Sequence, residues 1–454
     1  MSGTFSSLST ALSALRYNQA AMDVASGNVA NAGTEGYARR KIVAETVGPP
    51  AVPALWSRWD GTGDGVAVGS VQRTVDPLLD ARARTEHGQQ ALLEGRRDVL
   101  VRLETALGEP GDSGVAAALS DFGSGWHDVA NNTGDDAARS QLLARAGTLT
   151  SALATQARAV ATEWSDQRTR VDALTTEVNG LASDLARVND GIRVATVAGT
   201  DTGALMDRRD QIALRLAELV GADTVAAADG TVDVRVGGVS LVTGSNASTL
   251  QASGATTMAA ATTDPVTFSI GGVAVSVSAG TLGAASSVLG GALPDYLAEL
   301  DAVAATVAES VNAQHALGYD RNGAPGAMFF SGTTAATLAV ALTDPDQVAA
   351  SLTPGTLDGS NADVLAGLTD GQDNYRRLVT DFGSQVASAR RVADNQQVLT
   401  DQIDGSREAL SGVNIDEEMV NMLAHQRAYE AAARVITTLD SVLDTLINRT
   451  GLVR

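Results

Sequence analysis

The sequence of 454 residues contains no cysteine. This absence excludes disulfide bonds, thiolate catalysis and cysteine-based zinc sites. Aromatic residues make up only 4% of the chain, and no segment approaches the roughly 18 consecutive apolar residues that a membrane-spanning helix requires. The first residues contain neither a basic segment nor a continuous apolar segment, so we expect no secretory signal peptide.

Positive charge is also scarce, since 53 acidic residues face 32 basic ones and the formal net charge is -21. Such a surface repels the phosphates of nucleic acids and the headgroups of anionic lipids. We therefore expect neither nucleic acid nor a membrane as a partner. The length and the 44% of hydrophobic residues are sufficient for two to four domains, each with its own core.

Motifs that carry chemistry are missing as well. There is no Gly-x-Ser-x-Gly elbow and no His-Glu-x-x-His pair. The segment Gly61–Gly65 lacks the strand and helix that flank a phosphate loop, and Asp320–Gly323 opens like a calcium loop but lacks the later ligands. The histidines are scattered without metal-ligand spacing, at His87, His127, His315 and His425. We expect no enzyme, no metal and no cofactor.

An amphipathic helix is predicted at the amino terminus, from about Thr4 to Asn31. Apolar residues recur there at steps of three and four, which is typical of a coiled-coil stripe. At 1.5 Å per residue the helix is roughly 40 Å long. The turn that follows, up to Tyr37, contains residues tolerant of left-handed backbone. The stripe includes Leu8, Leu12, Leu15 and Met22.

The middle of the chain is predicted to be mostly helical. A Pro/Gly-rich stretch at residues 48–69 is typical of an extended connector. Helical patterning then starts at Asp76-Pro77 and runs with breaks to about Val220, and its longest uninterrupted part is 136–197. Further helices are expected over 294–317 and 363–409.

A small β insertion interrupts this helical pattern between about Val225 and Leu289. Residues 231–242 alternate strictly between apolar and polar side chains, and residues 266–277 repeat the pattern. Gly237-Gly238 is the type of dipeptide that closes a tight hairpin. The alternation therefore predicts antiparallel strands.

The last predicted helix, from about Asn414 to Arg449, has a clear start. Asn414 can cap it, and Glu417 stands at the position expected in a capping box. Patterning alone supports two interpretations equally: the terminal helices pack on the protein's own core, or they pair with each other or with another copy. The stripe of this helix includes Met419, Met422, Gln426, Tyr429, Ile436 and Leu443.

Both ends resemble motifs of the bacterial flagellar rod, hook and hook-associated proteins. The first is Asp23-Val-Ala-Ser-Gly-Asn-Val-Ala-Asn-Ala-Gly-Thr-Glu-Gly-Tyr37, in which Gly27 replaces an asparagine usual in the family. The second covers residues 411–436, with the run Glu-Glu-Met-Val-Asn near its start. The resemblance implies that Asn28, Asn31 and Tyr37 form a turn that contacts neighbouring subunits.

The interior resembles the hook-associated protein 1 family within this group. Residues 205–212 and 318–330 are similar to internal landmarks of that family, and over a hundred residues of helical pattern follow Asp76. Rod and hook proteins instead enter β-rich domains soon after the first motif. Because the β insertion is shorter than in longer members, we expect an outermost extra domain to be missing.

The resemblance implies a structural role at the hook–filament junction, outside the cell, after export without a cleavable signal. The expected partners are further copies of the chain, the hook protein, the second junction protein (hook-associated protein 3), an export chaperone and the export apparatus. One alternative is another axial flagellar protein, such as a hook or rod component. A surface hydrolase with coiled-coil ends is a second, although no nucleophile–base arrangement favours it.

The predicted fold class is mainly α with an inserted antiparallel β domain. Residues 1–38 and 411–454 form a helical assembly domain, 39–222 and 290–410 a mostly helical body, and 223–289 the β domain. The residues of the two stripes, with the three turn residues Asn28, Asn31 and Tyr37, are the predicted assembly interface. We expect the two ends to be poorly ordered in the free monomer, because their stripes lack a partner before assembly.

Overall fold

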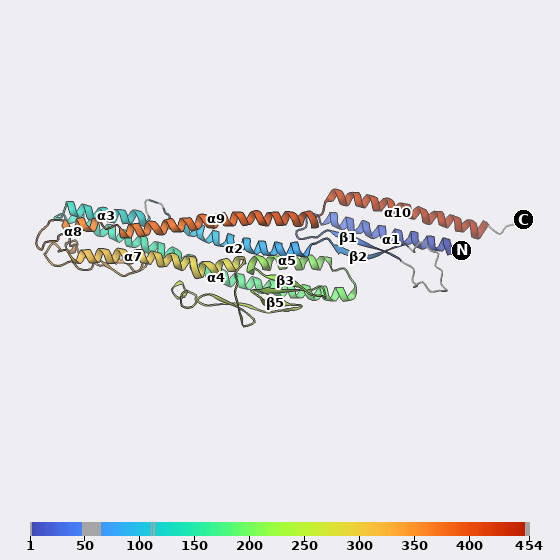
Figure 1. Ribbon diagram of the computed structural model, residues 1–454, viewed down its shortest axis with the longest axis horizontal. Helices are drawn as coiled ribbons and strands as arrows, with labels where there is room; N and C mark the ends of the chain where they lie inside the picture. Colours follow the sequence, from blue (N-terminus) through green and yellow to red (C-terminus); the bar gives the residue numbers. More distant parts are fainter. Residues whose placement is uncertain (1, 48–64, 110, 112–113, 450–454) are drawn as a thin grey trace.

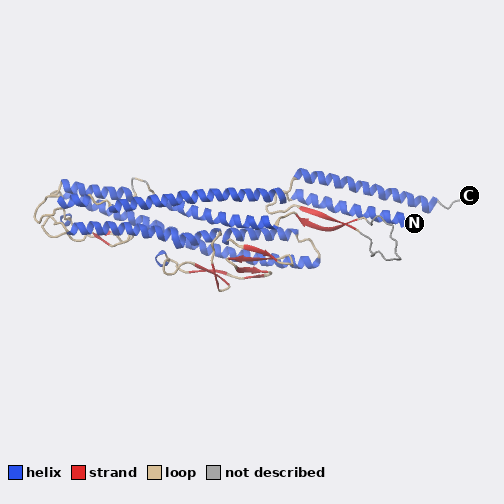
Figure 2. Ribbon diagram, in the orientation of Figure 1, coloured by secondary structure: helices blue, strands red, loops and turns tan. Residues whose placement is uncertain are grey.

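The computed structural model describes residues 2–47, 65–109, 111 and 114–449. The predicted connector at 48–69 lies largely outside these residues. The molecule is elongated, and its helices run along the long axis (Figure 1). Two terminal helices lie side by side at one end, and the loops of the helical body form the other end (Figure 2).

The terminal end consists of two helices and a hairpin. α1 (Ser2–Ala30) packs along α10 (Ile415–Asp444), and the antiparallel strands β1 (Arg40–Thr46) and β2 (Val66–Arg73) lie against α1. The side chain of Asn414 caps α10 by accepting hydrogen bonds from the backbone N–H groups of Asp416 and Glu417. The predicted cap at Asn414 is therefore confirmed, while the side chain of Glu417 pairs with Arg39 at 3.2 Å.

The body is a bundle of long helices. Its central member, α4, has 63 residues and is about 95 Å long at 1.5 Å per residue. Asp76 and Asp135 cap α2 and α4 through their carboxylates, and Gly199 ends α4 with a φ of 67°. The body helices are α2 (Pro77–Leu107), α3 (Val115–Asn131), α4 (Asp136–Ala198), α5 (Gly203–Val220), α6 (Gly280–Ser287), α7 (Leu293–Ala316), α8 (Ser360–Ala366) and α9 (Asp370–Ser411).

One predicted helix is interrupted in the structure. The run expected over 363–409 is divided into α8 and α9 by the residues 367–369. Gly367 caps α8, and Leu368 packs against the core. Leu368 continues the apolar pattern across the break. The sequence therefore predicted one continuous helix and gave no sign of the turn between α8 and α9.

The β insertion confirms the predicted antiparallel hairpins. Gly237-Gly238 joins β4 to β5 with φ values of 53° and 83°, and Gly271-Gly272 joins β8 to β9 with 57° and 84°. Both are the two-residue turns that require positive φ. One sheet contains β3 (Asp223–Ala226), β4 (Val232–Val236), β5 (Val239–Thr243) and β6 (Asn246–Ala247), and the other β7 (Leu250–Ser253), β8 (Thr267–Ile270) and β9 (Val273–Val275). Together with the helical body, they confirm the predicted fold class.

The end of the predicted insertion differs from this pattern, because residues 280–289 are helical. α6 packs against α2 and α5, and its residues Leu282, Ala284 and Ala285 are buried. A short helix that is apolar on most sides has no visible period, so sequence alternation could not separate it from a strand.

Aromatic side chains fill the core at the loop end of the body. Phe122, Trp126, Phe329 and Phe330 lie with ring centroids 4.8–6.1 Å apart. His315 is fully buried beside them. Its Nδ1 donates to a backbone carbonyl at 2.6 Å, and its Nε2 accepts from a backbone N–H at 2.9 Å. These bonds fix the neutral ring, and burial lowers the pKa of His315.

Candidate assembly interface

Small side chains form the seam between the terminal helices. On α1 the buried positions, besides Asn28, are Ala11, Asn18, Ala21 and Ala25, of which Ala25 is only 3% exposed. On α10 the corresponding buried apolar residue is Ala432. The α1 positions follow a seven-residue repeat, so the two helices approach through a narrow, alanine-rich coiled-coil seam.

Of the ten predicted stripe residues, three are exposed and seven are half-buried. Leu12 is 41% exposed and Met419 is 47% exposed, and Gln426 is also exposed. Leu12 and Met419 were included because they are large apolar side chains, whereas the fully buried apolar positions described on the two helices are alanines. The spacing of the alanines at 11, 21 and 25 was the signal that could have located these positions. The other predicted members are half-buried: Leu8, Leu15, Met22, Met422, Tyr429, Ile436 and Leu443.

Asn28 joins the three terminal elements. Its side chain is 1% exposed and makes four hydrogen bonds, which is the full capacity of an amide. Nδ2 donates to the carbonyl oxygen of Arg40 and to Glu418 Oε2, both at 2.9 Å. Oδ1 accepts from the hydroxyl of Tyr37 at 2.9 Å and from the backbone N–H of Arg40 at 3.0 Å. One side chain therefore connects α1, β1 and α10.

Glu418 is the partner of Asn28 on α10 and is only 3% exposed. Its other oxygen pairs with the guanidinium of Arg39 at 2.6 Å, which neutralises the buried carboxylate. Asn31, by contrast, bonds only locally: its Nδ2 donates to the carbonyl of Gly27 at 2.8 Å. Of the two predicted asparagines, Asn28 makes the connection between elements and Asn31 shapes the end of α1.

Arginines of the hairpin connect this end to the body. Arg73 pairs with Asp207 at 2.7 Å and with Asp210 at 2.8 Å, and Arg40 pairs with Asp207 at 3.4 Å. Both acidic residues lie on α5, inside the motif at 205–212 that the sequence singled out. Tyr37 lies 5.3 Å from the guanidinium of Arg40, and burial raises the pKa of its hydroxyl. The motif therefore fixes the terminal helices on the bundle.

An open cleft of about 580 Å³ lies at this junction, between the end of α1, the turn, the hairpin and α5. We refer to it as the elbow cleft. Its apolar lining includes Val24, Val71 and Ala204, and Asp23 and Glu35 are exposed at its rim. The further lining residues are Gly27, Asn31, Thr34, Tyr37, Arg40, Asp201, Asp207, Arg208 and Gln211.

The surface of α10 that faces away from α1 is also apolar. Val420 is 65% exposed, Leu423 51%, Val435 48% and Val442 42%. In Figure 1, α10 lies along the upper edge of the molecule with α1 below it. Val420 with Leu423, and Val435 with Val442, thus give two exposed apolar pairs, and exposed apolar patches mark interaction sites.

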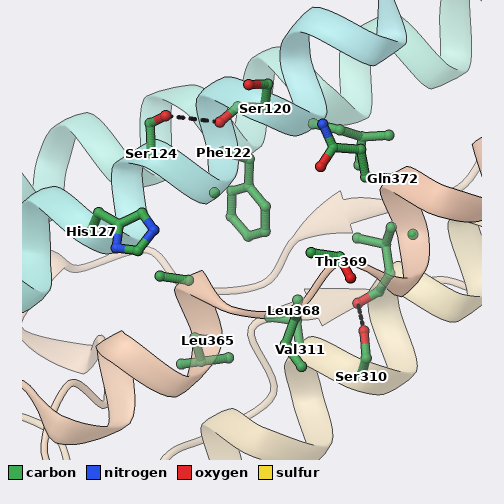
Figure 3. A pocket seen from close by; sticks show the side chains of 15 residues that line it. Ser120, Phe122, Ser124, His127, Ser310, Val311, Leu365, Leu368, Thr369 and Gln372 are labelled. Carbon is green, nitrogen blue, oxygen red and sulfur yellow. Dashed lines mark hydrogen bonds between the residues drawn. The ribbon is translucent and has the colours of Figure 1, made fainter. Parts of the chain in front are cut away.

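A smaller pocket of about 240 Å³ lies at the loop end of the body, between α3, α7, α8 and the start of α9 (Figure 3). His127 is the titratable side chain among its lining residues. Ser124 donates its hydroxyl to the carbonyl of Ser120 at 3.0 Å, not to a base. This geometry activates no nucleophile.

The remaining candidate chemistry is equally plain. Asp320 Oδ1 accepts from the backbone N–H groups of Asn322 and Ala324, as in an ordinary turn. Within the described ranges, no group of three or more metal-ligating side chains is assembled. Over the same part of the chain, no helix combines the length and apolar character that crossing a membrane requires.

Three families match separate parts of the sequence. "Flagellar hook-associated protein FlgK helical domain" matches residues 100–330, which include most of the bundle and the β insertion. "Flagella basal body rod protein" matches residues 8–37, and "Flagellar basal body rod FlgEFG protein C-terminal" matches residues 408–449. The last two matches coincide with α1 and its turn, and with α10.

Similar proteins extend over nearly the whole chain. Flagellar hook-associated protein 1 of Bacillus subtilis (strain 168) is 28% identical, over 99% of this chain and 99% of the relative. The protein of the same name from Escherichia coli (strain K12) is 24% identical, over 97% and 99%. The solved structure of the flagellar hook junction protein FlgK from Burkholderia pseudomallei shares the fold, with a TM-score of 0.65 and 16% identity. It is aligned over its full length to 73% of this chain.

Proposed function

Because the chain belongs to the FlgK family of flagellar hook-associated proteins, we propose that it is a structural subunit of the bacterial flagellum, located at the junction between hook and filament. The observation that carries this proposal is the combination of two parts in one chain. The paired ends resemble those of rod proteins, and the bundle between them resembles the FlgK helical domain.

The paired ends support an assembly role for α1 and α10. The fully buried apolar residues of the pair are alanines, while larger residues such as Leu12, Val420 and Leu423 stay exposed. Covering these residues with neighbouring subunits removes apolar surface from water, which stabilises the assembled state. The turn residues, the two predicted stripes and the outer face of α10 therefore form the proposed interface.

The finer points of the proposal concern partners and route. We propose contacts with further copies, with the hook protein on one side and with hook-associated protein 3 on the other. Export through the flagellar type III apparatus, with a chaperone, would deliver the chain to the hook tip. The division into an assembly domain, a body and a β domain belongs to the same proposal.

The continuous 63-residue α4 and the match of the FlgK helical domain favour this junction over a hook or rod component. No observation supports a hydrolase. The family is one of structural proteins, and the hydroxyl of Ser124 in the pocket of Figure 3 is donated to the carbonyl of Ser120.

Deleting the gene in its source bacterium tests the proposed function. We expect motility to be lost, hooks to form, and filament subunits to appear in the medium because they have no junction on which to polymerise. The intact gene on a plasmid should restore filaments, and antibody against the chain should label the hook tip. Normal filaments in the deletion strain would contradict the proposal.

A further inference from the structure

We propose that the elbow cleft binds the outer face of α10 from a second copy of the chain. The anchors are Val420, Leu423 and Arg427, which lie at positions i, i+3 and i+7 of the helix. This spacing is that of a helix seated in a groove. The proposal rests on the proposed function, since it names a contact between subunits of the same assembly.

One copy cannot fill its own cleft in this way. The α1 residues that line the cleft, such as Asp23, Val24 and Gly27, lie roughly half a turn around the helix from the seam residues Asn18 and Ala25, at 100° per residue. The cleft and α10 are therefore on different sides of α1. The outer face of α10 in turn is directed away from α1. The contact has to form between molecules.

Charge favours this occupant. Four carboxylates and two guanidinium groups line the cleft, and the carboxylates of Asp23 and Glu35 are exposed at its rim. Arg427 is exposed on the outer face of α10, beside Val420 and Leu423. The outer face of α10, with Val420, Leu423 and the basic Arg427, therefore complements the cleft, which has apolar lining residues and an acidic rim. Complementary potentials of this kind specify the partner and the register.

The cleft is large enough to accommodate a few side chains of a neighbouring helix, but not the whole helix. A volume of about 580 Å³ lies within the range of ordinary binding pockets. Val71 on the cleft floor is 39% exposed and Val68 on the same hairpin is 41% exposed, so the apolar surface continues beyond the cleft. Gly27 adds space, because nothing lies within 4 Å of a Cβ built on it.

The two surfaces differ, so the contact is heterologous. Each copy offers one cleft and one outer face, and the same contact can repeat from copy to copy. Such an interface produces a ring if the rotation closes and a helix if it does not. Either arrangement suits a short zone of subunits in a tubular structure.

Cross-linking in isolated flagella tests the contact, because the natural chain contains no cysteine. The variant Leu423→Cys with Ala204→Cys should give covalent dimers and larger species under mild oxidation. The control is Asn421→Cys with Ala204→Cys, since Asn421 is exposed on the same helix but lies roughly half a turn around it from Leu423, at 100° per residue. We expect the control to give at least a roughly tenfold lower yield of dimer.

A filling variant provides a second test. Gly27→Leu should place a side chain in the cleft without disturbing α1, and should reduce filament number. Gly147→Leu is the matched control, because it is also helical with nothing within 4 Å of a built Cβ, but lies on α4. Charge reversal at Arg427→Glu and Glu35→Arg should each weaken assembly, and the combined variant should recover part of it.

The outcomes separate the two proposals. If antibody labels the hook tip and the Leu423–Ala204 pair does not cross-link above the control, the cleft contact is wrong and the junction role stands. If the chain is absent from the hook tip, the junction role itself fails. Unchanged filament number in Gly27→Leu would also overturn the cleft contact.

Discussion

The substitution Asn28→Asp tests whether one buried amide joins the terminal helices to the hairpin. It preserves the shape of the side chain but replaces the two N–H donors with an oxygen. The carbonyl of Arg40 and the carboxylate of Glu418 then lose their donor, and two carboxylates face each other across the 2.9 Å contact. Losing a donor to a buried acceptor costs about 1–3 kcal/mol, and more when the acceptor is charged.

The two lost bonds together should destabilise the local structure by about 3–5 kcal/mol. The body does not depend on these bonds, so we expect local opening of the terminal end and little change in global unfolding. Since about 1.4 kcal/mol is a factor of ten, hydrogen exchange of the amides near Asn28 and Glu418 should accelerate at least roughly hundredfold. Mass spectrometry of peptides from α1 and α10 measures this directly.

The control is Asn31→Asp, three residues away. Asn31 donates to one carbonyl within its own helix, so its replacement should cost only about 0.5–1.5 kcal/mol. Acidification should partly restore the Asn28→Asp variant, because the protonated carboxyl regains one donor. The reasoning is refuted if both variants accelerate exchange by the same small factor, or if acid gives no recovery in Asn28→Asp.

Three further predictions use other parts of the structure. Leu12→Asp and Ile436→Asp should block filament attachment while circular dichroism shows a folded body; normal filaments would exclude a role of these stripes in assembly. Burial lowers the folded-state pKa of His315 below the ordinary 6.5. The neutral ring's contribution to the free energy of unfolding is therefore complete above pH 6.5 and declines as pH falls toward the folded-state pKa. Urea unfolding at several pH values should show this decline, and the decline should be smaller in His315→Gln. Arg73→Ala should leave the largely buried Asp207 short of a partner and cost about 3 kcal/mol at the junction with the body, seen as faster exchange in the hairpin and α5 with normal exchange in the core of the bundle.

Periodicity predicted the long elements well because their signals are local. Asp76, Asp135 and Asn414 cap helices through bonds to residues two or three positions away, and Gly237-Gly238 closes a hairpin between its immediate neighbours. A single sequence contains these patterns completely. The fold class therefore followed from the sequence.

The contacts between distant segments were not accessible in the same way. Asn28 and Glu418 are 390 positions apart, and nothing in the pattern of either helix indicates that the amide faces the carboxylate. The resemblance singled out Asn28 and the motif containing Asp207 separately. Only the structure shows that Asn28 and Asp207 both contact Arg40. Through this arginine, the motif in α5 holds the motif at the end of α1 in place.

The choice of small residues for the seam has a consequence for assembly. An alanine buries little apolar area, so the fully buried alanines of α1 and α10 contribute less than leucines at the same positions would. The buried Asn28 and Glu418 fix which residues face each other, as a polar group in a coiled coil fixes register at some cost in stability. Toward the ends of the pair, Leu12, Val435 and Val442 remain exposed and Ile436 and Leu443 are only half-buried. We therefore expect order in the free chain to decrease from Asn28 toward the ends of both helices, and neighbouring subunits to supply the stability that the seam itself lacks.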